Sequence, residues 1–147
     1  ADMSTDQLDA LVQVTDRHRV HGFIIANLTK RHHSPQIHQH EIRDIEKGGV
    51  SGKPVSILSN HLIQHLYRST HGRYTIMGCG GIFTAEDAYQ KIRSGASLVQ
   101  MITGMIFEGP QVIGEINRGL VRLLKKDGFS HISEAIGCGV KKSCIQE

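Results

Sequence analysis

Hydrophobic and polar positions along the chain switch between a helical period and short apolar runs that are typical of buried strands. Ser4, followed by Gln7 three residues later, predicts the start of a helix. The apolar residues that share one face of this helix are Leu8, Leu11 and Val12. Residues 23–26 then form an apolar run, which predicts a strand buried on both faces. Residues 28–54 show neither period and predict a long loop.

The remainder of the chain alternates helix and strand patterns. Residues 55–72 carry apolar side chains at helical spacing, and residues 74–77 predict a second buried strand. Thr84, with Asp87 three residues later, predicts the start of a helix that Gly95 ends. The remaining predicted elements are a strand at 97–101, helices at 103–107, 112–128 and 131–136, and a frayed tail at 141–147.

This order of elements predicts the fold class. Strands that alternate with helices imply an α/β protein with a parallel sheet. A closed (β/α)₈ barrel needs about 250 residues, and this chain has 147. We therefore expect residues 1–140 to be the C-terminal part of one TIM-barrel domain. Such a portion by itself exposes strand edges and an apolar face.

Composition excludes several classes of protein. No apolar run approaches the roughly 18 residues of a membrane span, and no pattern indicates a secretory signal. Three cysteines cannot form a full disulfide framework, which favours a reducing compartment. The net charge of +3 permits an anionic ligand, but without a clustered basic stripe it does not indicate nucleic-acid binding.

Two glycine-bearing loops that follow successive predicted strands form the most specific chemical pattern. One is GCGG at 78–81 and the other is ITG at 102–104. Glycine lets the backbone approach a ligand closely, and N–H groups at a helix start favour an anion. In barrels, phosphate often binds to the loops after the last two strands. The pattern predicts a phosphate site, and the alternative is that these glycines only make tight turns.

Other polar residues are ambiguous from the sequence alone. Asn27 follows a predicted strand, where its amide can bind a planar polar ligand or cap its own turn. Cys79 can be a reactive thiol or, more commonly, a small buried filler. His61 and His65 share a helix face, which we expect to be the solvent side.

A histidine-rich segment raises the question of a metal site. Its histidines are His32, His33, His38 and His40. Imidazole is a common ligand of transition metals, but no cysteine or spaced second pair completes a recognisable metal site. We therefore expect a solvated loop and no metal.

Four motifs resemble one known family. They are GGVSGKP at 48–54, GCGGI at 78–82, KIRSGASLVQ at 91–100 and FEGP at 107–110. In this order and spacing they resemble the C-terminal part of a class 2, quinone-dependent dihydroorotate dehydrogenase. The resemblance extends from about Ser4 to Gly139.

The resemblance implies a flavoprotein oxidoreductase with an FMN-binding (β/α)₈ barrel, of which this chain supplies about strands six to eight. Such enzymes oxidise dihydroorotate to orotate in pyrimidine biosynthesis and pass the electrons to a ubiquinone-type acceptor. The serine base and the N-terminal half of the barrel are expected upstream of this chain, so the chain alone is expected to be inactive. The full-length protein is expected to be peripheral on the bacterial cytoplasmic membrane or the mitochondrial inner membrane.

The resemblance also implies roles for individual residues. The expected cofactor-binding residues are Ala26, Gly52, Gly81, Ile102 and Thr103, and the expected substrate-binding residues are Asn27 and Leu28. Three of these depart from the family pattern, because Ala26 and Leu28 stand where threonines are usual and Ile102 stands for a common tyrosine. A site that recognises a polar ligand discriminates strongly through such hydroxyls.

These departures leave two alternatives open. One is a catalytically inactive half-barrel remnant that binds a phosphate-bearing ligand or a partner chain, and it would be cytoplasmic if the chain stands alone. The other is a related flavin oxidoreductase with a different substrate.

Overall fold

A parallel sheet of three strands, in the order β1-β2-β3, lies at the centre of the computed structural model, which describes residues 1–31 and 48–142. The strands are β1 (Gly22–Ile25), β2 (Thr75–Cys79) and β3 (Leu98–Gln100). Ile25 pairs with Gly78, and Cys79 pairs with Gln100. The three strands therefore end at one edge of the sheet, and the predicted parallel sheet is confirmed.

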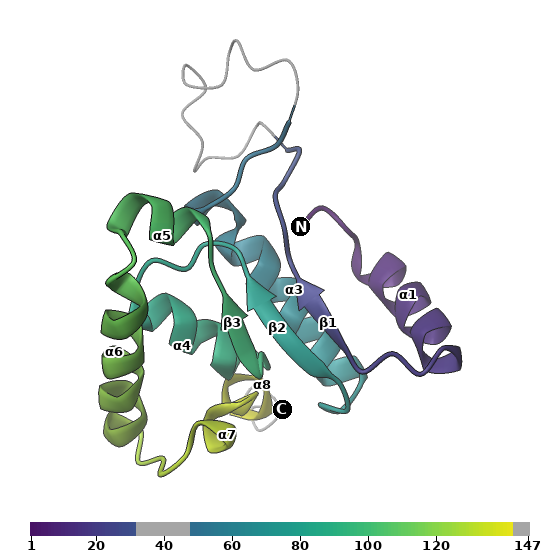
Figure 1. The fold of residues 1–147 in the computed structure, drawn as a ribbon. Helices are drawn as coiled ribbons and strands as arrows, with labels where there is room; N and C mark the ends of the chain where they lie inside the picture. The colour runs from purple at the N-terminus through teal and green to yellow at the C-terminus, as the bar shows by residue number, and fades with distance from the viewer. Residues whose placement is uncertain (32–47, 143–147) are drawn as a thin grey trace.

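Helices connect the strands in the predicted alternation (Figure 1). They are α1 (Thr5–Arg17), the 3₁₀ helix η1 (Lys53–Val55), α3 (Ser56–Ser69), α4 (Ala85–Arg93), α5 (Thr103–Glu108), α6 (Val112–Lys126), α7 (Ile132–Ala135) and α8 (Cys138–Lys142). Helices α3 and α4 cover one face of the sheet, and α6 packs on the outer side of α4. Helix α8 was not predicted, and residues 143–147 of the predicted tail lie outside the described residues.

Both predicted helix start signals are confirmed. The Gln7 backbone N–H donates to Ser4 Oγ at 3.2 Å, and the Ser4 N–H donates to Gln7 Oε1 at 2.9 Å. Thr84 and Asp87 form the same reciprocal pair at the start of α4. These bonds satisfy N–H groups that a helix otherwise leaves without partners.

The main core lies between the sheet and its helices. Its fully buried members are Ile63, Leu66, Ile76 and Ala96, and Leu8 and Val12 of α1 pack against them. Leu11 was expected on this inner face, but 39% of it is exposed. Leu8 and Val12 are four residues apart and point to the core, whereas Leu11 lies at the edge of that stripe. A second cluster joins α4 to α6.

The other face of the sheet is open in the part of the chain that the structure describes. Ile24 of β1 is 66% exposed and Leu98 of β3 is 54% exposed. The prediction that the strand at 23–26 is buried on both faces is therefore wrong at Ile24, because the helices cover one face of the sheet only (Figure 1). The exposed apolar face agrees with the expectation for a portion of a barrel.

The loop predicted at 28–54 is described only at its two ends, and these ends are joined. The backbones of Thr29 and Val50 form an isolated antiparallel bridge, with N···O distances of 2.9 and 2.8 Å. This bridge brings the segment from Gly49 to η1 beside the end of β1. The four histidines at 32, 33, 38 and 40 lie outside the described residues. No described helix is long and apolar enough to cross a membrane.

Candidate functional site

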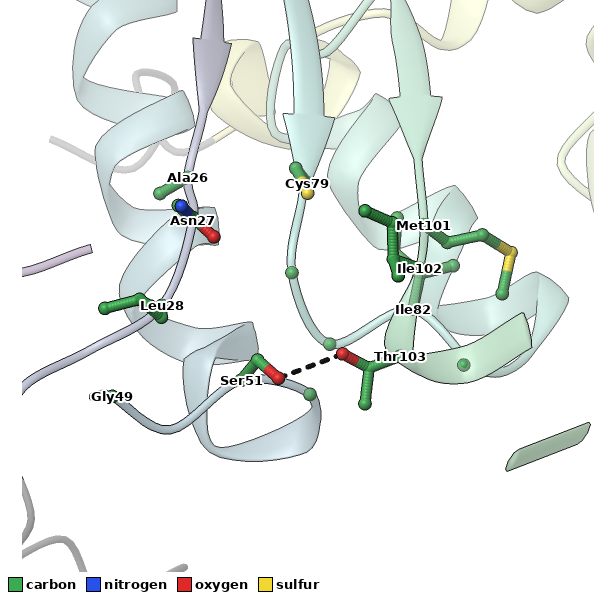
Figure 2. A pocket seen from close by; sticks show the side chains of 14 residues that line it. Ala26, Asn27, Leu28, Gly49, Ser51, Cys79, Ile82, Met101, Ile102 and Thr103 are labelled. Carbon is green, nitrogen blue, oxygen red and sulfur yellow. Dashed lines mark hydrogen bonds between the residues drawn. The ribbon is translucent and has the colours of Figure 1, made fainter. Parts of the chain in front are cut away.

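A pocket of about 230 Å³ opens at the edge of the sheet where the three strands end (Figure 2). The loops that follow β1, β2 and β3 all line it, together with the segment that precedes η1. In parallel α/β folds, this edge is where ligands bind, because the loops there converge from several strands.

Every residue that was expected to bind cofactor or substrate lines this pocket. These residues are Ala26, Asn27 and Leu28 after β1, Gly52 before η1, Gly81 after β2, and Ile102 and Thr103 after β3. They come from four separate segments, so no local pattern alone brings them together. Their individual roles remain predictions.

The glycine turn after β2 has the geometry of a close backbone approach. Gly80 and Gly81 have φ values of +95° and +76°, which side chains rarely adopt. A Cβ on Gly81 would lie 2.5 Å from the Cβ of Ser56, so the turn packs tightly on the start of α3. Among the described residues, no backbone oxygen accepts a hydrogen bond from the Gly80 or Gly81 N–H. The predicted phosphate site at this turn therefore stays a prediction, with two backbone N–H groups that lack a backbone partner.

A second close contact joins the segment before η1 to the loop after β3. Gly52 has a φ of +82°, and a Cβ there would lie 3.1 Å from Cγ2 of Thr103. The hydroxyl oxygens of Ser51 and Thr103 are 3.0 Å apart and form a hydrogen bond across the pocket (Figure 2). The contact fixes two loops that are distant in sequence into one wall.

Asp87 stabilises the segment that follows the glycine turn. Its Oδ2 accepts hydrogen bonds from the backbone N–H groups of Phe83 and Thr84 at 2.9 and 3.0 Å, and from Lys53 Nζ at 2.5 Å. Burial raises the pKa of this carboxyl, but the bonds from Lys53 and the two N–H groups outweigh it, and the net pKa is lowered. Asp87 is therefore a carboxylate at neutral pH and ties η1 to α4.

Asp2 holds the segment that contains Leu28. Its carboxylate accepts from Thr29 Oγ1 at 2.5 Å and from the Lys30 N–H at 2.7 Å. The hydrogen bond from Thr29 is the main cause that lowers the pKa of Asp2. These bonds fix the backbone immediately after Asn27, whose side chain lines the pocket.

Several further lining residues were not among the cofactor- and substrate-binding residues that the resemblance implies. They are Gly49, Ser51, Cys79, Gly80, Ile82, Met101 and Gly104. Most of them lie inside the glycine motifs, so those motifs could have indicated them. The hydrogen bond between Ser51 and Thr103 joins residues 52 positions apart, and no sequence pattern indicates it. Cys79 is a partly buried free thiol that lines the pocket.

Two histidine predictions have different outcomes. His61 is exposed, as expected, whereas the Nε2 of His65 lies 2.8 Å from Asp9 Oδ1 and joins α3 to α1. The expected solvent position is therefore wrong for His65, because α1 packs on that side of α3. Within residues 1–31 and 48–142, no cluster of histidine, cysteine or acidic side chains could hold a metal ion.

Comparison with known proteins identifies relatives along nearly the whole chain. The family model for dihydroorotate dehydrogenase matches residues 2–124. A dihydroorotate dehydrogenase (quinone) from Crocosphaera subtropica is 43% identical in an alignment 141 residues long, which covers 92% of this chain and 37% of the relative. The mitochondrial enzyme of that name from Arabidopsis thaliana is 40% identical over 92% of this chain and 29% of its own length. The chain thus spans about a third of the length of these curated relatives.

Solved structures agree with this result. Ligand-free DHODH from Eimeria tenella superposes with a TM-score of 0.84 at 31% identity, covering 93% of this chain and 37% of that one. The DHODH–ferulenol complex from the same organism gives 0.82 at 32% identity, with coverage of 93% and 36%. Those enzymes are TIM barrels, and the three strands described above form part of such a barrel. This chain belongs to the dihydroorotate dehydrogenase family.

Proposed function

We propose that the full-length protein that carries this chain is a quinone-dependent dihydroorotate dehydrogenase, which oxidises dihydroorotate to orotate in pyrimidine biosynthesis. One observation carries the proposal. One pocket at the carboxyl edge of the sheet is lined by residues from four separate segments. The resemblance to the family implies a cofactor- or substrate-binding role for a residue in each of these segments. Nothing in the described residues or the comparisons favours an inactive remnant.

The pocket fits a flavin with a phosphate group, and we propose FMN. The backbone N–H groups of Gly80 and Gly81 are without backbone partners among the described residues, and the absence of a side chain on Gly52 lets its segment approach Thr103 closely at the pocket. In this proposal Gly52, Gly81, Ile102 and Thr103 hold the cofactor, with Ala26 beside it. FMN, when bound, supplies the redox chemistry between dihydroorotate and the quinone.

The substrate position is proposed beside Asn27 and Leu28. The Asn27 amide can donate to and accept from a polar ring, which orients the ring in the pocket. Leu28 offers apolar surface there and excludes water, where a threonine would donate a hydrogen bond. The base that removes the substrate proton is proposed to come from the part of the protein outside this chain.

We also propose how the rest of the protein completes the site. The other strands of the barrel are proposed to pair with the free edges of β1 and β3, so that the apolar face that carries Ile24 and Leu98 lines the barrel interior. Because a ubiquinone-type acceptor is dissolved in a membrane, the full-length protein is proposed to bind peripherally to the bacterial cytoplasmic or mitochondrial inner membrane.

Turnover of dihydroorotate tests this function. The full-length protein is assayed with dihydroorotate and a soluble ubiquinone analogue, and wild type is compared with Asn27→Ala and with Asn117→Ala, the same change at an exposed position of α6. Loss of the substrate hydrogen bonds at Asn27 is expected to lower kcat/KM by about 10- to 100-fold. Asn117→Ala is expected to match wild type. A flavin-loaded wild type without turnover would contradict the proposed substrate.

A further inference from the structure

Lys91 is a charged residue in an unusual place. It lies on α4 with 0% of its surface exposed, between the sheet and α3. A Cβ on Gly78 of β2 would come within 3.1 Å of Lys91 Cδ, so a glycine in the strand leaves room for the lysine stem. Lysine is almost never fully buried without a partner, which makes its contacts informative.

The amine of Lys91 lies at the start of a hydrogen-bond chain that leads to the pocket wall. Nζ donates to Ser59 Oγ and, at 2.9 Å, to Asn60 Oδ1. Ser59 Oγ in turn lies 3.2 Å from the Ser56 carbonyl oxygen and 3.5 Å from that of Gly80. Because Ser59 accepts from the amine, its single proton is left to be shared between these two carbonyl oxygens, of which that of Ser56 is the nearer.

The chain ends on the turn proposed to bind phosphate. Gly80 is in that turn, and its neighbour Gly81 packs directly on Ser56. The Ser59 hydroxyl of α3 reaches the Gly80 carbonyl oxygen through a long hydrogen bond of 3.5 Å. A turn held in this way keeps its N–H groups oriented before the ligand arrives, which lowers the ordering cost of binding.

The charge of Lys91 is poorly compensated inside the protein. Burial lowers its pKa from 10.5 to about 8, and the weaker influences of Cys79 on β2 and Asp87 on α4 raise it. The groups that α3 presents to the amine, Ser59 and Asn60, are neutral. Asp87 itself is engaged by Lys53. The amine is thus a cation at neutral pH, and the described residues offer it no carboxylate as a hydrogen-bond partner.

We propose that Lys91 is a positioning residue of the phosphate site, which holds the turn at 79–82 through Ser59 and, as a buried cation, increases the affinity for the flavin phosphate. This inference rests on the proposed function, because it takes the pocket to bind FMN. An anion at the turn would in return stabilise the charged form of the amine, so binding and protonation are linked.

The test is FMN affinity as a function of pH. Full-length apoprotein is titrated with FMN between about pH 6 and pH 10, a range that brackets the titration of Lys91. The variant Lys91→Met keeps an apolar stem without the charge, and Lys125→Met removes a charge from an exposed position of α6 as the control. We expect Lys91→Met to bind FMN about tenfold more weakly at neutral pH and to lose the fall in affinity that wild type shows above about pH 8. Lys125→Met is expected to follow wild type.

A second variant separates position from charge. Ser59→Ala keeps the cation but breaks the chain to Gly80, so a several-fold loss of affinity with the wild-type pH dependence is expected. Equal FMN affinity in wild type and both variants, or a loss that is the same at every pH in Lys91→Met, would overturn the inference. If Lys91→Met does not fold, an unchanged FMN affinity in Ser59→Ala is sufficient to overturn the inference. If the wild-type protein binds no FMN, that result contradicts the proposed function itself, and is thereby distinguished from a failure of the inference about Lys91.

Discussion

Replacement of Gly81 by alanine is expected to damage both the stability and the ligand site of this protein. Gly81 has a φ of +76°, and an added Cβ would lie 2.5 Å from Ser56 Cβ and 2.7 Å from Ser56 Cα. The contact is with the first residue of α3, which cannot move without displacing the helix. Gly128 provides a matched control, because its φ is +79° and no atom lies within 4 Å of its added Cβ.

The two substitutions differ in one contribution to the free energy of unfolding, the steric contact of the added Cβ. Both place an alanine in the left-handed region, which costs about 1–2 kcal/mol. Only Gly81→Ala also forces an overpacked contact, which costs about 1–3 kcal/mol more. We therefore expect the free energy of unfolding to fall by about 2–5 kcal/mol for Gly81→Ala and by about 1–2 kcal/mol for Gly128→Ala.

Urea unfolding of the full-length protein measures this difference, and the flavin content of each purified variant is measured in parallel. Gly81→Ala is expected to lose flavin as well, because the turn that carries the proposed phosphate donors is displaced. Gly128→Ala is expected to retain it. Equal loss of stability in the two variants would refute the packing argument, and full flavin retention in Gly81→Ala would refute the role of the turn.

Two further predictions concern the pocket and its support. Asp87→Asn is expected to lower the free energy of unfolding by about 1 kcal/mol at neutral pH, the usual effect of a lost cap. The pKa of Asp87 in the folded protein is lowered below its ordinary value of 3.8. The stability that Asp87 contributes is therefore present above pH 3.8 and is lost as the pH falls through the folded-state pKa. The free energies of unfolding of wild type and variant, measured with urea, should therefore converge in acid. Leu28→Thr restores a hydroxyl at the proposed substrate position and is expected to lower the KM for dihydroorotate about fivefold, from roughly 1 kcal/mol of hydrogen bonding. An unchanged KM would remove Leu28 from the substrate site.

The sequence predicted the positions of the helices and strands better than it predicted the burial of those elements. Capping pairs at Ser4 and Thr84 mark helix starts through local bonds, so both were found. Burial of the strands was overestimated, because an apolar run such as 23–26 does not reveal whether a second layer is present. Helix α8 is a short segment that contains a glycine, and it offered no apolar period.

The candidate site was predictable because parallel strands end at one edge. Loops after successive strands must therefore meet, and Asn27, Gly81 and Thr103 do line one pocket. The Ser51–Thr103 bond and the burial of Lys91 depend on contacts between segments that are distant along the chain. A lysine in a helix pattern is normally read as solvated, and only the packing against Gly78 and Ser59 shows otherwise.

The central claim is that this pocket belongs to an enzyme that passes electrons from dihydroorotate to a bound flavin. Anaerobic mixing of the full-length, flavin-loaded protein with dihydroorotate tests it directly, with the visible absorbance of the flavin as the readout. The account predicts that the absorbance is bleached and that a ubiquinone analogue restores it. A flavin that keeps its absorbance in the presence of dihydroorotate, yet is bleached by a chemical reductant, would contradict the account.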